Sequence, residues 1–118
     1  TRGAESFAAS LDAGEVVQLP AISSIASSLG ARQVCDQALL SAQHHPVISD
    51  VISDSAAIAG CETLLREHRI LVEPACGAAV AAITESVRHL AELDSVLIVV
   101  CGGVTMTAEG LREYGQSS

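Results

Sequence analysis

Apolar side chains recur at helical spacing through much of the chain. Phe7 and Leu11 lie four residues apart and precede Gly14, a residue type that suits the left-handed conformation beyond a helix end. Serine, threonine or proline stands near the start of later stretches, which is typical of helix starts. The pattern predicts helices over residues 5–13, 23–29, 32–43, 56–69, 74–93 and 107–114.

Two apolar runs predict strands instead. Residues 96–100 are all apolar and lie between Asp94-Ser95 and Gly102-Gly103, as in a strand that is covered on both faces. The β-branched residues within 47–52 predict a second strand. Because the apolar content comes almost wholly from Ala, Val, Ile and Leu, the sequence indicates an α/β fold with helices packed on a buried sheet.

Composition limits the chain to one domain or part of one. It has 118 residues, of which 49% are hydrophobic, so it can bury one core but not two. Fourteen acidic residues against six basic ones give a net charge of −8, which repels nucleic acid and anionic membranes. All six basic residues are arginine, so the chain contains no lysine.

The four cysteines lack any C-x-x-C pair, which excludes a zinc knuckle and a redox dithiol motif. We therefore expect reduced, mostly buried thiols in a cytoplasmic protein. No apolar run approaches the roughly 20 residues of a membrane span. The chain begins with Thr1 instead of Met, from which we expect a truncated or processed chain.

Candidate chemistry gathers at the turn Cys101-Gly102-Gly103, which follows the strand at 96–100. Ligands in α/β proteins bind at the carboxyl ends of strands. Taken alone, a core cysteine followed by turn glycines is the favoured interpretation. Glu73, just before Pro74, is expected to cap a helix. His44-His45 lack partners for a metal site and are expected to lie at a helix end.

Five short blocks, in order and in register, resemble one enzyme family. They are Thr1-Arg-Gly-Ala-Glu-Ser-Phe7, Leu19-Pro-Ala-Ile-Ser-Ser24, Ser28-Leu-Gly-Ala31, Ile70-Leu-Val-Glu-Pro-Ala-Cys-Gly-Ala-Ala79 and Ile98-Val-Val-Cys-Gly-Gly103. Together they are similar to the C-terminal part of the L-serine dehydratase/L-threonine deaminase family of fold type II pyridoxal-phosphate enzymes. The resemblance implies that residues 1–118 form the C-terminal part of the cofactor-binding large domain, with helices on a mostly parallel sheet.

The resemblance implies an enzyme about three times this length. Its N-terminal portion would supply the Schiff-base lysine for pyridoxal phosphate, which this chain lacks, so we expect the chain alone to be inactive. The implied reaction releases ammonia from L-serine or L-threonine and gives pyruvate or 2-oxobutyrate. The implied assembly is a cytoplasmic homodimer that binds a small amino acid and neither nucleic acid nor membrane.

The resemblance also assigns two sets of residues. Cys101 matches the cysteine that faces the pyridine nitrogen of the cofactor, and the expected cofactor contacts are Cys101, Ser28 and Gly102. A monovalent cation, expected to be potassium, would be held by Ala4, Ser6, Leu29 and Ala31, with a glutamate ligand just before Thr1. Val104-Thr105 replaces the polar pair that usually follows in the family, which leaves the hydrogen bonding of that turn open.

A non-catalytic role is the main alternative. A regulatory or degenerate relative could use the same crevice to bind an amino acid or the cofactor, and the absence of lysine favours it. The presence of Cys101 together with Ala4 and Ser6 favours the enzyme, because a purely structural module needs none of them.

Overall fold

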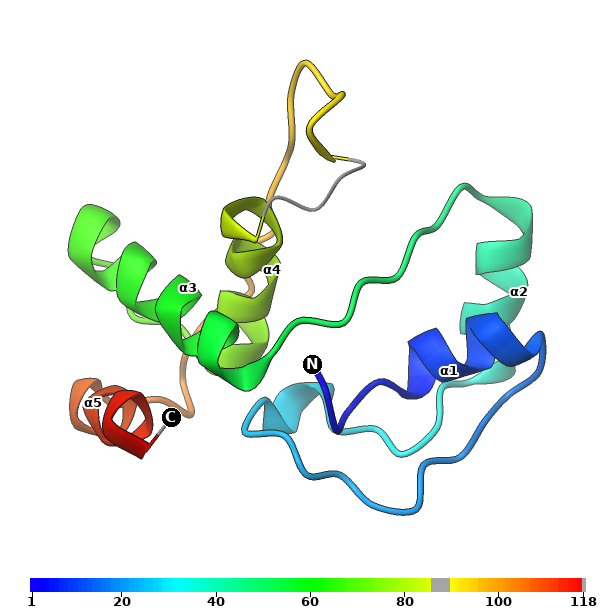
Figure 1. Cartoon of the computed structure of the whole chain (residues 1–118), viewed down its shortest axis with the longest axis horizontal. Coiled ribbons are helices and arrows are strands. Elements are labelled where there is room, and N and C mark those ends of the chain that lie inside the picture. Colours follow the sequence, from blue (N-terminus) through cyan, green and yellow to red (C-terminus); the bar gives the residue numbers. More distant parts are fainter. Residues whose placement is uncertain (86–89, 118) are drawn as a thin grey trace. The chain divides into compact units, whose positions relative to one another are not determined.

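The computed structural model describes residues 1–85 and 90–117 and divides into two compact units, Thr1–Val51 and Ile52–Ser118 (Figure 1). The first unit contains α1 (Ser6–Ala13), the short 3-10 helix η1 (Ser27–Leu29) and α2 (Asp36–His44). The second contains α3 (Asp54–His68), α4 (Pro74–Thr84) and α5 (Ala108–Ser117).

In the first unit, α1 packs against α2, and backbone contacts hold the connecting segments. Gly14 ends α1 in the left-handed conformation (φ 72°), as the sequence predicts, and its N–H donates to the Leu11 carbonyl. The Leu19 N–H donates to the Arg32 carbonyl (2.7 Å), and Nε of Arg32 donates back to the Leu19 carbonyl (2.9 Å). This pairing keeps residues 32–35 outside a helix, so α2 begins at Asp36 and the expected start at residue 32 is wrong.

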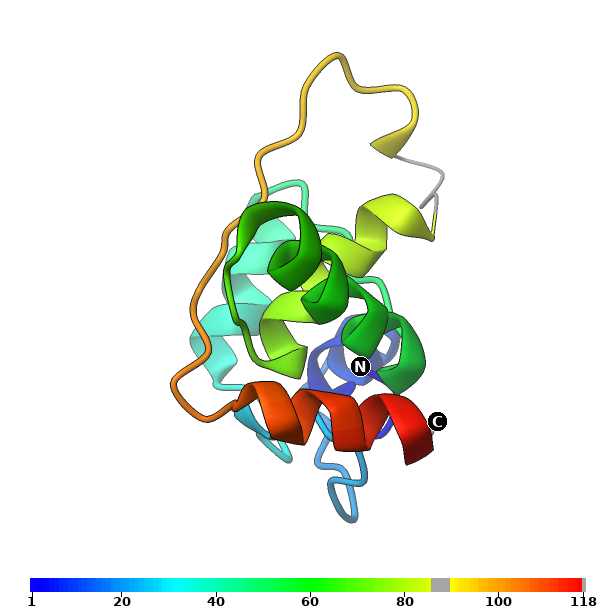
Figure 2. The ribbon, with the colours of Figure 1, turned by 90° about the vertical axis from the view of Figure 1, so that its left-hand side faces the viewer.

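In the second unit, α3 packs closely along α4, and α5 lies against α3 (Figure 2). The two longer helices approach at Gly60 and Gly77, where a Cβ on either glycine would collide with backbone atoms of the other helix. Buried apolar residues, four of them alanine, form the core cluster at this contact: Ile52, Ala56, Ala57, Ala78 and Ala81. The small residues that the sequence places at 75–82 therefore permit the close packing of two helices.

Capping residues begin two helices where the sequence predicts them. Oγ of Ser53 accepts from the Ala56 N–H (3.1 Å) at the start of α3. Oγ1 of Thr107 accepts from the Gly110 N–H (3.0 Å) in the first turn of α5. These caps depend on residues three positions apart, so local sequence is sufficient to predict them.

The helix expected over 74–93 is shorter than predicted. It ends at Thr84, whose Oγ1 donates to the Ala81 carbonyl and so competes with backbone hydrogen bonding at that turn. Residues 86–89 lie outside the described part of the chain, and residues 91–93 beyond them are not helical.

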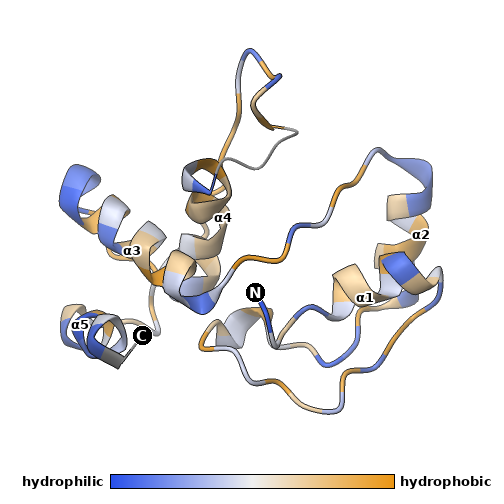
Figure 3. Cartoon of the chain, viewed as in Figure 1, coloured by the Kyte–Doolittle hydropathy of each residue, from blue (hydrophilic) through white to orange (hydrophobic). Residues whose placement is uncertain are grey.

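The described residues contain no strand, so neither the strand at 96–100 nor the one at 47–52 forms in this structure. The apolar run at 96–100 instead lies on the surface, with Leu97 at 91% exposure and Val99 at 71% (Figure 3). A strand needs a neighbour for its N–H and C=O groups. The helices of the α/β expectation are present, and the sheet stays a prediction.

Candidate functional site

The turn that carries Cys101 lies against the start of α4. The Glu73 N–H donates to the Gly102 carbonyl (3.1 Å). Gly103 packs so tightly on the preceding segment that a Cβ there would meet backbone atoms of Leu71 and Val72. Gly102 has φ of 135°, a conformation that favours glycine. Both glycines are therefore required by the path that presents the Cys101 thiol at the surface.

Cys101 adjoins a second thiol, that of Cys76 on α4. Cys76 is fully buried and Cys101 is exposed, and the Cys76 thiol is near enough to influence the protonation of Cys101. Partial desolvation, the Cys76 thiol and the nearby Glu73 carboxylate all raise the pKa of Cys101. The thiol is consequently neutral at physiological pH, with the properties of a weak donor and not of a nucleophile.

A third thiol lies at the crossing of α3 and α4. Cys61 is fully buried in the second unit, and burial raises its pKa to about 11. The expectation of four free thiols is confirmed, but only Cys61 and Cys76 are buried, while Cys35 and Cys101 are exposed.

Glu73 has a different role from the one its position suggests. It stands immediately before α4, yet its side chain makes no cap hydrogen bond, so the capping interpretation is wrong. Instead, Oγ1 of Thr105 donates to Oε2 of Glu73 at 2.5 Å. Thr105 thus supplies a side-chain hydrogen bond at the turn after Gly103, where the sequence left the hydrogen bonding open. Sequence analysis missed this pair because its members are 32 positions apart.

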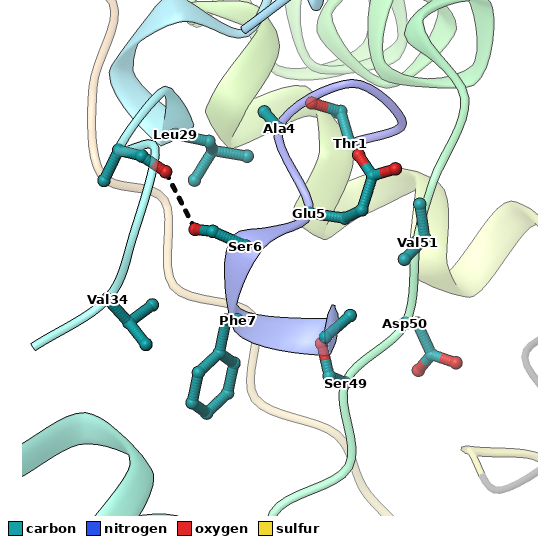
Figure 4. Close-up of a pocket in the computed structure, with 12 residues that line it drawn as sticks. Thr1, Ala4, Glu5, Ser6, Phe7, Leu29, Val34, Ser49, Asp50 and Val51 are labelled. Carbon is teal, nitrogen blue, oxygen red and sulfur yellow. Dashed lines mark hydrogen bonds between the residues drawn. The ribbon is translucent and has the colours of Figure 1, made fainter. Parts of the chain in front are cut away.

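In the first unit, the residues expected around a cation line one cavity of about 230 Å³ (Figure 4). Its lining includes Ala4, Ser6, Leu29 and Ala31. Ser6 is 3% exposed, and its Oγ donates to the Ala31 carbonyl at 2.8 Å. The structure therefore brings these four residues together, and the binding of a cation there stays a prediction.

Glu5 lines the same cavity and was not singled out from the sequence. Its Oε2 is buried and has no hydrogen-bond partner among the described residues. In Figure 4 the carboxylate points toward Thr1 and Val51, while the Ser6 hydroxyl points the other way, where it donates to the Ala31 carbonyl. The sequence offered one indication that Glu5 lines the cavity, namely its position between Ala4 and Ser6.

The remaining expected residues belong to different elements and units. Ser28 belongs to η1 in the first unit, whereas Cys101 and Gly102 belong to the second. His44 ends α2, where its Nδ1 lies 2.7 Å from the Leu40 carbonyl, as its interpretation as a helix-end residue predicts. Within residues 1–85 and 90–117, no group of three or more His, Cys, Asp or Glu side chains could hold a metal ion.

The chain matches one known protein family. The family model described as "Pyridoxal-phosphate dependent enzyme" matches residues 1–102. The chain belongs to this family. Pyridoxal phosphate is accordingly the cofactor of the family. The exposed Cys101 thiol can be compared with the chemistry that this cofactor requires.

The relatives of this chain are named as serine dehydratases or as similar to them. The human protein named L-serine dehydratase/L-threonine deaminase is 43% identical over 120 residues, covering 95% of this chain and 37% of the relative. The rat protein named serine dehydratase-like is 43% identical over 121 residues, covering 96% of this chain and 37% of that protein. The chain thus spans well under half the length of these relatives.

A solved structure agrees with these relatives. The crystal structure of a fungal L-serine ammonia-lyase from Rhizomucor miehei matches with a TM-score of 0.91 and 30% sequence identity. The match covers 98% of this chain and 38% of the fungal chain. This likeness supports the fold type II assignment for the family member.

The described residues fit one side of a pyridoxal-phosphate site. Cys101 offers an exposed, neutral thiol, which suits an uncharged ring nitrogen. The sequence offers no lysine for the Schiff base, so residues 1–118 do not supply that group. Within the described ranges, no helix has the length and apolar character to cross a membrane.

Proposed function

We propose that this chain is part of a pyridoxal-phosphate-dependent L-serine/L-threonine ammonia-lyase, which converts its substrates to pyruvate or 2-oxobutyrate and ammonia. The observation that carries the proposal is the 43% identity to an L-serine dehydratase/L-threonine deaminase across 95% of the chain. The exposed, neutral Cys101 thiol supports the proposal, because it has the chemistry required at the ring nitrogen.

Cys101 would tune the cofactor without forming a bond to the substrate. When bound, pyridoxal phosphate supplies an electron sink for the substrate's α-carbon. A neutral thiol donates only a weak hydrogen bond to the pyridine nitrogen and leaves it unprotonated, in contrast to a carboxylate. The resulting moderate electron withdrawal favours prompt loss of the β-hydroxyl group over slower side reactions. Gly102 and Ser28 would contact the same cofactor.

The cavity in the first unit would hold a monovalent cation, with potassium as the proposed ion. The Ser6 hydroxyl oxygen and the Ala31 carbonyl oxygen lie 2.8 Å apart, and both are hard oxygen donors. Ala4 and Leu29 line the same cavity and would contribute backbone carbonyl oxygens. Oε2 of Glu5 is buried in this lining and has no hydrogen-bond partner among the described residues. An oxygen acceptor in this position also favours a cation.

The finer features of the whole protein belong to the same proposal. Residues 96–100 would become a strand of a mostly parallel sheet once neighbouring strands are supplied by other parts of the enzyme. The assembly would be a cytoplasmic homodimer. The main competing role is a degenerate relative that binds an amino acid or the cofactor without turnover, and the absence of lysine from this chain favours it.

The deciding experiment uses the complete reading frame that encodes this chain. The purified protein, loaded with pyridoxal phosphate, is given L-serine or L-threonine, and the oxoacid and ammonia are measured with and without added potassium. The proposal requires both products in equal amounts and a higher rate in potassium. D-serine formed from L-serine without pyruvate would identify a racemase. Cofactor binding without any product would identify the degenerate relative.

A further inference from the structure

We propose that Thr105 and Glu73 form a positioning pair, in which the Thr105 hydroxyl fixes the Glu73 carboxylate beside the turn that presents Cys101. The pair itself is independent of the enzyme's identity, and only its relevance to a cofactor rests on the proposed function. Neither residue is expected to touch a substrate.

The first support is the geometry around the turn. Two hydrogen bonds join the turn to Glu73, one from the Glu73 N–H to the Gly102 carbonyl (3.1 Å) and one from Thr105 Oγ1 to Glu73 Oε2 (2.5 Å). They lie on either side of Gly103, which has no free space around its α-carbon. The Met106 N–H also donates to the Gly103 carbonyl (2.9 Å), which closes the turn. Residues 102–106 are therefore held against the start of α4 from both ends.

The second support is the electrostatic environment of the thiol. The groups that act on Cys101 are its own backbone, the Cys76 thiol on α4 and the Glu73 carboxylate just before α4. The negative charge of Glu73 disfavours the thiolate and so contributes to the raised pKa of Cys101. The hydrogen bond from Thr105 favours one position of the carboxylate beside Cys101, from which this effect is exerted.

The test measures thiol reactivity in this chain, without cofactor or substrate. The rate of alkylation by iodoacetamide is followed from pH 7 to pH 10, and the protein is then digested with trypsin. Because the chain has arginine and no lysine, cleavage places Cys101 alone in peptide 89–112. The exposed Cys35 shares peptide 33–66 with the buried Cys61, and fragment-ion masses assign the label to one of the two. Cys35 lies in the other unit and serves as the internal reference.

Two substitutions separate charge from position. Glu73→Gln removes the charge but keeps an oxygen acceptor, and should raise the Cys101 alkylation rate at pH 8 by about threefold. Thr105→Val keeps the charge but removes this hydrogen bond to the carboxylate, and should raise the rate by a smaller factor. Thr105→Ser restores the hydroxyl and should restore the original pH profile. Cys35 should be unchanged in all three variants.

The double variant is the decisive measurement. If Thr105 acts only through Glu73, Glu73→Gln with Thr105→Val should match Glu73→Gln alone, because no charge is left to position. Independent additive effects, an unchanged Cys101 profile, or equal changes at Cys35 would overturn the inference. Alkylation of buried Cys76 would reveal a variant that unfolds. If a Glu73 variant unfolds, the Cys101 rates of Thr105→Val and Thr105→Ser decide, and equal rates in these two variants would overturn the inference. A failure here leaves the proposed ammonia-lyase activity untouched.

Discussion

Cys101 is the residue whose replacement best tests the proposed chemistry of the complete enzyme. A neutral hydrogen bond contributes about 1 kcal/mol, so Cys101→Ala should lower the turnover rate by roughly tenfold or less. Cys101→Asp should protonate the pyridine nitrogen, change the absorption spectrum of the bound cofactor and increase transamination relative to elimination. Spectra and product ratios provide the measurement. Complete loss of turnover in a folded, cofactor-loaded Cys101→Ala enzyme would contradict a tuning role.

Cys61 links protonation to the stability of the second unit. Its pKa is about 11 in the folded chain because of burial, against 9.0 for an unperturbed thiol. The unfolded chain therefore releases this proton first, so the stabilising contribution is complete below pH 9 and is lost as the pH rises to 11. We expect a loss of about 2 kcal/mol over this interval from urea unfolding curves.

Two alanine variants provide the control for this pH dependence. Cys61→Ala should be less stable at pH 7 but should lose less further stability between pH 9 and 11. Cys35→Ala should keep the original pH dependence, because Cys35 is exposed. The absence of lysine keeps this pH window free of the amines that usually titrate in it. Equal pH dependence in both variants would show that Cys61 is not responsible.

Individual residues differ in how far the sequence predicts them. Gly14, Ser53 and Thr107 act on backbone groups within three or four positions, and their sequence assignments are confirmed. Glu73 fails as a cap because its partner, Thr105, is distant along the chain and becomes a neighbour only in the folded unit. Local patterns thus predict local hydrogen bonds, whereas contacts between distant residues need the fold.

At the scale of elements, the contact between α3 and α4 depends on two glycines. A methyl group at Gly77 would collide with the Ala57 carbonyl oxygen, which is a backbone atom and cannot turn aside, and with the buried Cys61 sulfur. Gly77→Ala should therefore destabilise the second unit by about 2 kcal/mol or more, measured by urea unfolding. Gly115→Ala in α5 is the control, because its nearest neighbour is the mobile end of Glu62 and alanine favours helix. Equal stability of both variants would contradict the close crossing.

Helices and strands differ in how much of their stability is local. Helices α1, α3 and α5 appear close to their predicted bounds, because each closes its backbone hydrogen bonds within its own residues. The apolar run at 96–100 has the composition of a strand, but its hydrogen-bond partners must come from another segment. The sequence therefore predicts the tendency of this run to form a strand, while its pairing within a sheet stays a prediction.

At the scale of the whole chain, the absence of lysine limits its chemistry with the cofactor. Treatment with pyridoxal phosphate and borohydride should leave no reduced adduct on any side chain, since only the α-amino group of Thr1 can react. Mass spectrometry of the peptides locates any adduct, and prior acetylation of the α-amino group should abolish it. An adduct on an internal residue would refute this expectation.

The segment at 96–100 also allows sheet formation to be followed by hydrogen–deuterium exchange. Its backbone amides lack strand partners in the described structure, so they should exchange with deuterium within seconds at neutral pH, while amides at the crossing of α3 and α4 remain protected. In the complete polypeptide, formation of the proposed sheet should slow exchange at these same amides. Following their protection over time would report when the sheet closes during folding, separately from when the helices form.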